Sequence, residues 1–128
     1  MDLIEGVELV EKQTYLDGNF KPNTSLEFIS GFDTAFGSNY IYPTNYPVRD
    51  YQFNIIRKAL LYNTLVVLPT GLGKTFLASV VMYNFYRWYP QGKLIFMAPT
   101  KPLVAQQIEA CYNIMGLPQD DTVEMTGK

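Results

Sequence analysis

The spacing of hydrophobic residues changes repeatedly along the second half of the chain. Apolar residues recur three or four positions apart at about 48–62, 73–88 and 102–115, which is typical of amphipathic helices. The intervening runs 64–68 and 93–97 are short, continuous and apolar, as in strands of a parallel sheet buried on both faces, and 121–125 is a candidate third strand. This alternation of helix and strand predicts a doubly wound α/β fold with right-handed crossovers.

Each expected helix has a stripe of residues that would face the core. The stripes are Ile55, Ile56, Ala59 and Leu60 in the first; Leu77, Val80, Val81, Asn84, Phe85 and Trp88 in the second; and Val104, Ile108, Cys111 and Met115 in the third. Tyr89-Pro90-Gln91-Gly92 should end the second helix, and Gly116 with Pro118 the third. We therefore expect a parallel sheet with flanking helices.

Residues 1–45 lack sustained periodicity, and glycine, serine and asparagine recur among scattered aromatics. Pro43 and Pro47 favour extended backbone and mark a boundary, so we expect a mostly irregular extension over residues 1–41 and a domain over 42–128. Residues 1–45 hold seven acidic and two basic side chains, a net −5, and residues 46–128 hold eight basic and five acidic, a net +3. The acidic, aromatic extension is either a docking segment for a protein partner or a poorly ordered lead-in.

The segment between the first expected strand and the second helix has the composition of a phosphate-binding loop. Gly71 and Gly73 can take positive φ and let backbone N–H groups converge on phosphate oxygens, and the N-terminus of the next helix adds unpaired donors. Lys74 would reach the β- and γ-phosphates, and the Thr75 hydroxyl would bind Mg²⁺. The full motif has a glycine where this chain has Leu68; a chance glycine turn before an ordinary helix is the alternative.

Three weaker motifs lie around this loop. Gln52 could read an adenine edge, or be an ordinary surface residue of its helix. Pro99, Thr100 and Lys101 follow a buried strand, and a helix N-terminus there would suit a nucleic-acid phosphate or simply provide an N-cap. Thr126-Gly127 is too short to weigh alone.

Together and in this order, the motifs resemble the front half of the first RecA-like domain of superfamily 2 helicases. Arg49-Asp50-Tyr51-Gln52 resembles the Q motif, Pro69 to Thr75 motif I, Ala98 to Gln107 motif Ia, and Thr126-Gly127 motif Ib. The longer stretches Tyr42 to Gln52 and Pro99 to Gln107 resemble the Fanconi anaemia group M family, in particular its fungal mutator-phenotype helicases. That family commonly has arginine where this chain has Lys101, so the positive charge is kept but the planar guanidinium group of arginine is absent.

The resemblance covers about residues 42–128 and implies a partial RecA-like P-loop NTPase domain. It implies an ATP-driven 3′-to-5′ DNA helicase or translocase that acts on branched DNA in recombination and repair, located in the nucleus. Its cofactors would be ATP and Mg²⁺, with Lys74 and Thr75 catalytic, Thr75 on the metal, and Pro99, Thr100, Lys101, Thr126 and Gly127 on DNA. The nucleotide-binding positions would be Gln52, Leu68, Pro69, Thr70, Gly71, Leu72, Gly73, Lys74, Thr75 and Phe76.

Other features bound this interpretation. The chain has one cysteine and no histidine, which argues against an internal disulfide and a structural zinc site, and no apolar run reaches the ~20 residues of a membrane span. No Walker B carboxylate pair is recognisable, so we expect little ATP turnover from this chain alone, and an incompletely covered sheet should expose apolar surface. Another P-loop NTPase and a non-catalytic interaction module are the alternatives.

Overall fold

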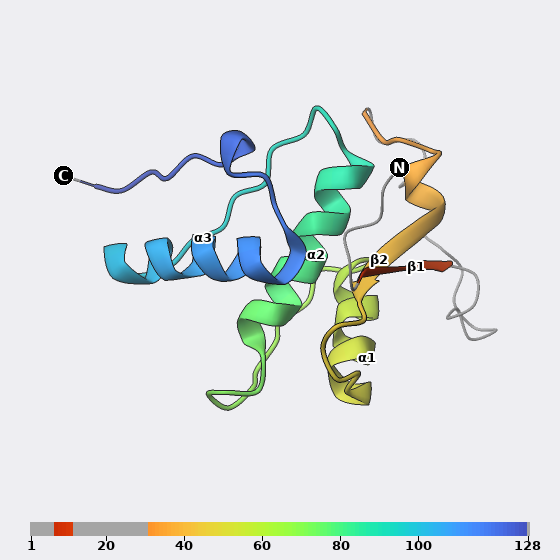
Figure 1. Cartoon of the computed structure of the whole chain (residues 1–128), viewed down its shortest axis with the longest axis horizontal. Helices are drawn as coiled ribbons and strands as arrows, with labels where there is room; N and C mark the ends of the chain where they lie inside the picture. Colours follow the sequence, from red (N-terminus) through yellow and green to blue (C-terminus); the bar gives the residue numbers. More distant parts are fainter. Residues whose placement is uncertain (1–6, 12–30, 128) are drawn as a thin grey trace.

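The computed structural model describes residues 7–11 and 31–127. Its elements follow the order β1 (Val7–Glu11), the 3-10 helix η3 (Phe36–Ser38), β2 (Asn39–Pro43), α1 (Asp50–Ala59), α2 (Lys74–Trp88), α3 (Lys101–Met115) and the 3-10 helix η4 (Gln119–Asp121). Figure 1 shows α2 at the centre, with α1 and β2 on one side and α3 on the other. None of the helices in the described ranges is long and apolar enough to cross a membrane.

The three expected helices are all present, and local signals set their ends. α3 begins after Thr100, whose hydroxyl accepts a hydrogen bond from the Leu103 N–H at 3.4 Å, and ends at Gly116, which has a φ of 66°. α2 begins after Gly73 and ends before Tyr89. α1 is shorter than the expected 48–62, since it spans only Asp50–Ala59.

Strand β2 pairs with β1 as a two-stranded antiparallel sheet, in a register that places Leu9 opposite Ile41. Tyr40, Ile41 and Tyr42 of β2 are at most 3% exposed. Within the expected extension, residues 7–11 form β1 and residues 36–41 belong to η3 and to the buried strand β2, while the mostly irregular character of residues 1–41 as a whole stays a prediction. The rest of that expected extension, residues 1–6 and 12–30, lies outside the described residues.

Side chains of α2 hold the other edge of β2. The amide oxygen of Asn84 accepts a hydrogen bond from the Ile41 N–H at 2.6 Å, and its amide nitrogen donates to the Ile41 carbonyl at 2.8 Å. The Trp88 indole N–H donates to the Asn39 carbonyl at 2.9 Å. In return, the Asp33 N–H donates to the Trp88 carbonyl at 2.7 Å, which satisfies a group at the end of α2. A buried polar side chain therefore replaces a neighbouring strand along this edge.

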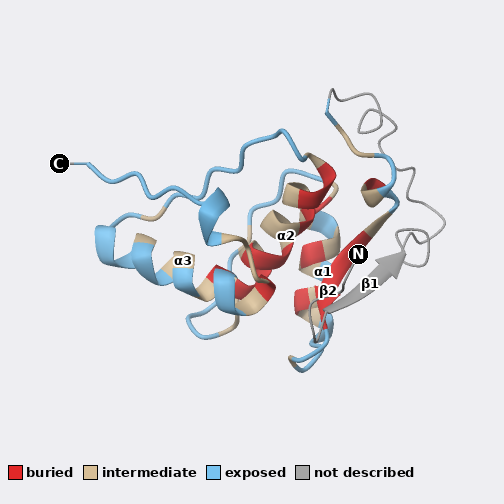
Figure 2. Cartoon of the chain, turned by 45° about the horizontal axis from the view of Figure 1, so that its top comes forward, coloured by how far each residue is buried: buried red, intermediate tan, exposed pale blue. Residues whose placement is uncertain are grey.

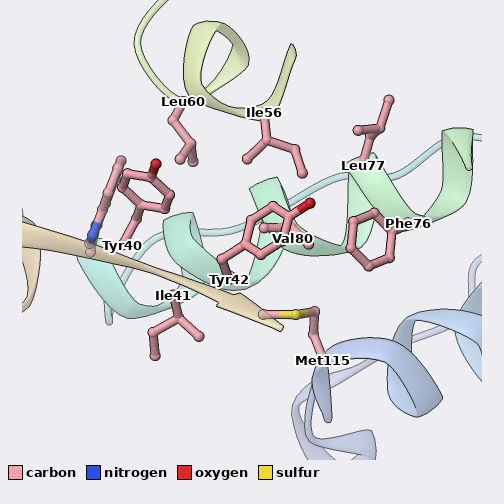
Figure 3. Close-up of a cluster of buried hydrophobic side chains, with 10 residues drawn as sticks. Tyr40, Ile41, Tyr42, Ile56, Leu60, Phe76, Leu77, Val80 and Met115 are labelled. Atoms are coloured by element: carbon pink, nitrogen blue, oxygen red, sulfur yellow. The ribbon is translucent and has the colours of Figure 1, made fainter. Parts of the chain in front are cut away.

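The core lies where β2 and the three helices meet (Figure 2). Figure 3 shows side chains from all four elements converging there, and each is at most 8% exposed. The expected stripes supply most of this core, because the helix period placed the right residues inward. Its buried residues are Tyr40, Ile41, Tyr42, Ile56, Leu60, Phe76, Leu77, Val80, Trp88 and Met115.

The expected parallel sheet is not confirmed. Residues 64–68, 93–97 and 121–125 contain no strand, and the only paired strands in the described ranges are β1 and β2. Val66 and Leu68 pack against the core, whereas Leu65 and Val67 are 89% and 83% exposed. A run that is apolar on both faces was expected to be buried on both, but a strand also needs backbone partners, and these segments do not pair with each other.

Candidate nucleotide-binding loop

The segment between Leu68 and α2 has the backbone conformation expected of a phosphate-binding loop. Gly71 and Gly73 have φ values of 85° and 90°, in the left-handed region that other residues rarely adopt. Gly73 caps α2, and its carbonyl accepts the Leu77 N–H at 3.0 Å as a first helical bond. The N–H groups of the first turn of α2 have no partner within the helix and are therefore available to an anion.

The expected catalytic residues are the first two of α2. Lys74 is exposed, and Thr75 is half-buried. The side chain of Phe76 is only 8% exposed and packs in the core, so only the backbone N–H of this residue could meet a ligand. Pro69 and Thr70 are exposed, and Leu68 is half-buried. The loop thus offers one exposed cation and a set of backbone donors, which is the chemistry that binds phosphate groups.

Two neighbouring side chains of α1 bind the same backbone atom of the loop. The Tyr51 hydroxyl donates a hydrogen bond to the Leu72 carbonyl at 2.9 Å, and the Gln52 amide nitrogen donates to it at 3.2 Å. Gln52 is 7% exposed, so it is not the surface residue that the sequence left open as an alternative. A side chain on Gly73 would meet the Gln52 amide nitrogen, so an alanine there would require this amide to shift, in addition to the strain from the positive φ. The structure therefore brings the Q-motif glutamine and the loop together.

An aromatic cluster supports the loop from behind. The Phe76 ring lies 5.8 Å from that of Tyr42 and 5.5 Å from that of Tyr46, both edge to face, and the Tyr42 ring lies 5.3 Å from that of Phe53. Burial raises the pKa of Tyr42 above its ordinary value of 10.0, and the nearby Tyr51 raises it further. The cluster joins β2, α1 and α2, so it helps to fix the start of α2 relative to the helix that carries Gln52.

The expected nucleic-acid residues lie away from this loop. Thr100 caps α3, Lys101 is its first residue, and both are exposed, as is Pro99. Thr126 and Gly127 are exposed in the C-terminal segment. Figures 1 and 2 both show the start of α3 and the C-terminal segment at the same end of the molecule. The two groups are thus on one side, but no described contact joins them.

Two contacts of the site carried no recognisable signal in the sequence. The first is the hydrogen bond from the Tyr51 hydroxyl to the loop. The Thr75 hydroxyl donates a hydrogen bond to the side-chain oxygen of Gln107, in the middle of α3, at 2.9 Å. A glutamine inside a helix has no distinctive spacing, so only the packing of α2 on α3 reveals it.

The donor set is compatible with nucleotide-bound magnesium. In residues 7–11 and 31–127, no group of three or more carboxylate, thiol or imidazole side chains is close enough to hold a metal ion. Mg²⁺ commonly keeps several waters and binds through few protein ligands together with the phosphates of the substrate. Thr75 is at the correct end of the helix for such an ion, so the residues present fit ATP with magnesium.

Comparisons with known proteins agree with these motifs. The family model described as "Type III restriction enzyme, res subunit" matches residues 45–127. The "Fanconi anemia group M protein homolog" of Mus musculus is 69% identical over 97 residues, which is 76% of this chain and 5% of that protein. The "DEAD-box ATP-dependent DNA helicase Fancm" of Drosophila melanogaster is 65% identical over 102 residues, 80% of this chain and 7% of that protein.

A third relative extends the similarity to a fungus. The "ATP-dependent DNA helicase fml1" of Schizosaccharomyces pombe is 52% identical over 113 residues, 88% of this chain and 13% of that protein. The chain thus spans only a small fraction of the length of these relatives, and no solved structure matches it. The resemblance to the Fanconi anaemia group M helicases is confirmed by these identities, and because the family match covers most of its length, the chain belongs to the family of the type III restriction enzyme res subunit.

Proposed function

We propose that this chain forms the ATP-binding front of a 3′-to-5′ ATP-dependent DNA helicase or translocase. The observation that carries the proposal is the loop itself, with two glycines at positive φ before α2 and its Leu72 carbonyl held by Tyr51 and Gln52. The names of the relatives from D. melanogaster and S. pombe support ATP and DNA as ligands. We further propose that the protein acts on branched DNA during recombination and repair in the nucleus.

In this proposal the backbone donors of residues 69–76 surround the phosphates, and Lys74 supplies the positive charge. Magnesium, when bound with ATP, would neutralise charge that develops on the phosphates during transfer. Thr75 would contribute its hydroxyl oxygen to the ion. Since the Gln52 amide nitrogen is engaged with the loop, the amide oxygen is the group with which this residue would meet the adenine.

A calorimetric titration tests the nucleotide site. Wild-type chain should bind ATP in the presence of Mg²⁺, and Lys74→Ala should lose that binding, because a charge-assisted contact to the phosphates is removed. Lys58→Ala is the matched control, since Lys58 is an exposed lysine of α1 outside the loop. Unchanged ATP binding by Lys74→Ala, or equal losses in both variants, would show that the loop is not a nucleotide site.

The DNA part of the proposal is tested at the start of α3. Thr100, Lys101 and the free N–H groups there would contact phosphates, and Pro99 would set the entry of the chain into the helix. Lys101→Ala should weaken binding of single-stranded oligonucleotides uniformly across sequences and lower the dependence of affinity on salt. Lys93→Ala, another exposed lysine, is the control. Thr126 and Gly127 are proposed as a second contact on the same side.

A further inference from the structure

A hydrogen bond between the Thr75 hydroxyl and Gln107 links α3 to the first turn of α2. It is 2.9 Å long and joins residues 32 positions apart. Hydrogen bonds between two side chains are a minority in folded proteins, and this one engages the hydroxyl to which we assign the metal. Both side chains are half-buried, so water competes for the bond less than it would on an open surface.

A threonine hydroxyl has one proton and two lone pairs. When its oxygen binds a cation through a lone pair, the proton must point away from the ion. The side-chain oxygen of Gln107 accepts that proton, so it fixes the rotation of the hydroxyl with a lone pair left free. Because a bound cation polarises the hydroxyl and makes it a stronger donor, the bond to Gln107 would strengthen when the metal binds.

A second contact between the two helices lies one turn further along. The Ser79 hydroxyl donates a hydrogen bond to the Thr75 carbonyl at 2.7 Å, and its oxygen lies 3.1 Å from the Cys111 sulfur. Ser79 and Cys111 are each four residues beyond the members of the first contact, so both pairs lie along the same seam. Ser79 is fully buried and Cys111 is 6% exposed, which makes this seam a fixed part of the interior.

We propose that Gln107 is a positioning residue for the divalent ion at Thr75, a role that rests on the proposed nucleotide site. Gln107 touches neither the nucleotide nor the ion, and it acts through the orientation of the Thr75 hydroxyl. Partners of this kind typically change metal affinity by about 10–100-fold when they are removed. A purely structural bond between α2 and α3 would instead affect the fold, and with it ATP binding in the presence and absence of metal alike.

The test compares ATP affinity with Mg²⁺ and with EDTA by calorimetry on the full chain. Gln107→Met keeps the length and helix preference of the side chain but removes the oxygen acceptor. The gain in ATP affinity that Mg²⁺ provides relative to EDTA should be about 10–100-fold smaller in this variant than in wild-type chain. Its ATP affinity in EDTA should be unchanged. Gln107→Glu retains an acceptor and should restore the gain. Gln106→Met, at the exposed neighbouring position, should leave both affinities unchanged.

Thr75→Val should lose at least as much as Gln107→Met, and the double variant should lose no more than Thr75→Val alone, because Gln107 acts only through that hydroxyl. The proposal is overturned if Gln107→Met keeps the full Mg²⁺ gain, or if its affinity falls equally in EDTA. It is also overturned if Gln107→Glu folds and fails to restore the gain. Failure of the nucleotide site itself is recognised separately, because wild-type chain would then bind no ATP with Mg²⁺.

Discussion

Replacing Asn84 by leucine should destabilise the chain by removing the group that holds β2 on α2. Asn84 is fully buried, and its amide makes hydrogen bonds with the N–H and the carbonyl of Ile41, which is itself 2% exposed. Leucine is of similar size, so the cavity term is small and the loss comes from the backbone groups left without partners. Each buried unpaired group costs about 1–3 kcal/mol, so two of them give about 2–6 kcal/mol.

That cost is a large part of the total stability expected for a domain, about 5–15 kcal/mol. Urea unfolding followed by fluorescence measures it, because Trp88 is the only tryptophan and is fully buried at the end of α2. With a slope of about 2 kcal/mol per molar urea, the midpoint should fall by about 1–3 M. Asn113→Leu, at an exposed position of α3, is the control and should change stability by about 0.5 kcal/mol or less.

The reasoning would be refuted if Asn84→Leu unfolded at the same urea concentration as the control. Such a result would mean that water or a neighbouring chain segment satisfies Ile41 equally well, and that β2 is not held by the amide. A lower midpoint with an unchanged slope is the expected pattern, since the folded state would be as compact as before.

Three further predictions concern the loop, the cysteine and the exposed apolar segments. Gly73→Ala should weaken ATP binding more than Gly71→Ala, because both residues have positive φ but only at Gly73 would a side chain meet Gln52; equal affinities by calorimetry would contradict this. Burial raises the pKa of Cys111 above 9.0 despite its hydrogen bond with Ser79, so its thiol should react slowly with a disulfide reagent. The free energy of unfolding should fall above about pH 9, because the thiol of the unfolded chain ionises first. Fast labelling of the folded chain would refute this. The wild-type chain, with the exposed apolar faces of 64–68 and 93–97, should bind an apolar fluorescent dye more strongly than Leu65→Lys does. Equal dye binding by the two would argue that these faces are covered in solution.

The sequence predicted those parts of the fold that depend on local signals. The stripes of α2 and α3, the glycine at the end of α3 and the positive-φ glycines of the loop follow from spacing and from single-residue preferences. Strand pairing could not be predicted in this way, because a continuous apolar run such as 64–68 does not say which backbone will lie beside it. Its burial on one face only is a property of the whole arrangement.

The missed elements share that dependence on distant parts of the chain. β2 lies next to glycine- and asparagine-rich sequence, and it is a strand because it pairs with β1 and because Asn84, more than forty residues away, binds its other edge. For the site, the motifs identified the loop and Gln52, but they did not predict that Tyr51 binds the Leu72 carbonyl or that Gln107 binds the Thr75 hydroxyl. Such contacts come from the packing of α1 and α3 on α2.

The two ends of α2 are held by different parts of the molecule, which has a consequence for interpreting genetic variants. Its first two turns bind α3 through Thr75 and Ser79, whereas its last two turns bind the β2 region through Asn84 and Trp88. In a mutational scan, changes at the β2 end should lower protein abundance while the molecules that survive retain normal ATP affinity. Changes at Lys74 and Thr75, to which we assign the phosphates and the metal, should do the opposite, so abundance and ATP affinity together would tell a geneticist which end of the helix a variant had altered.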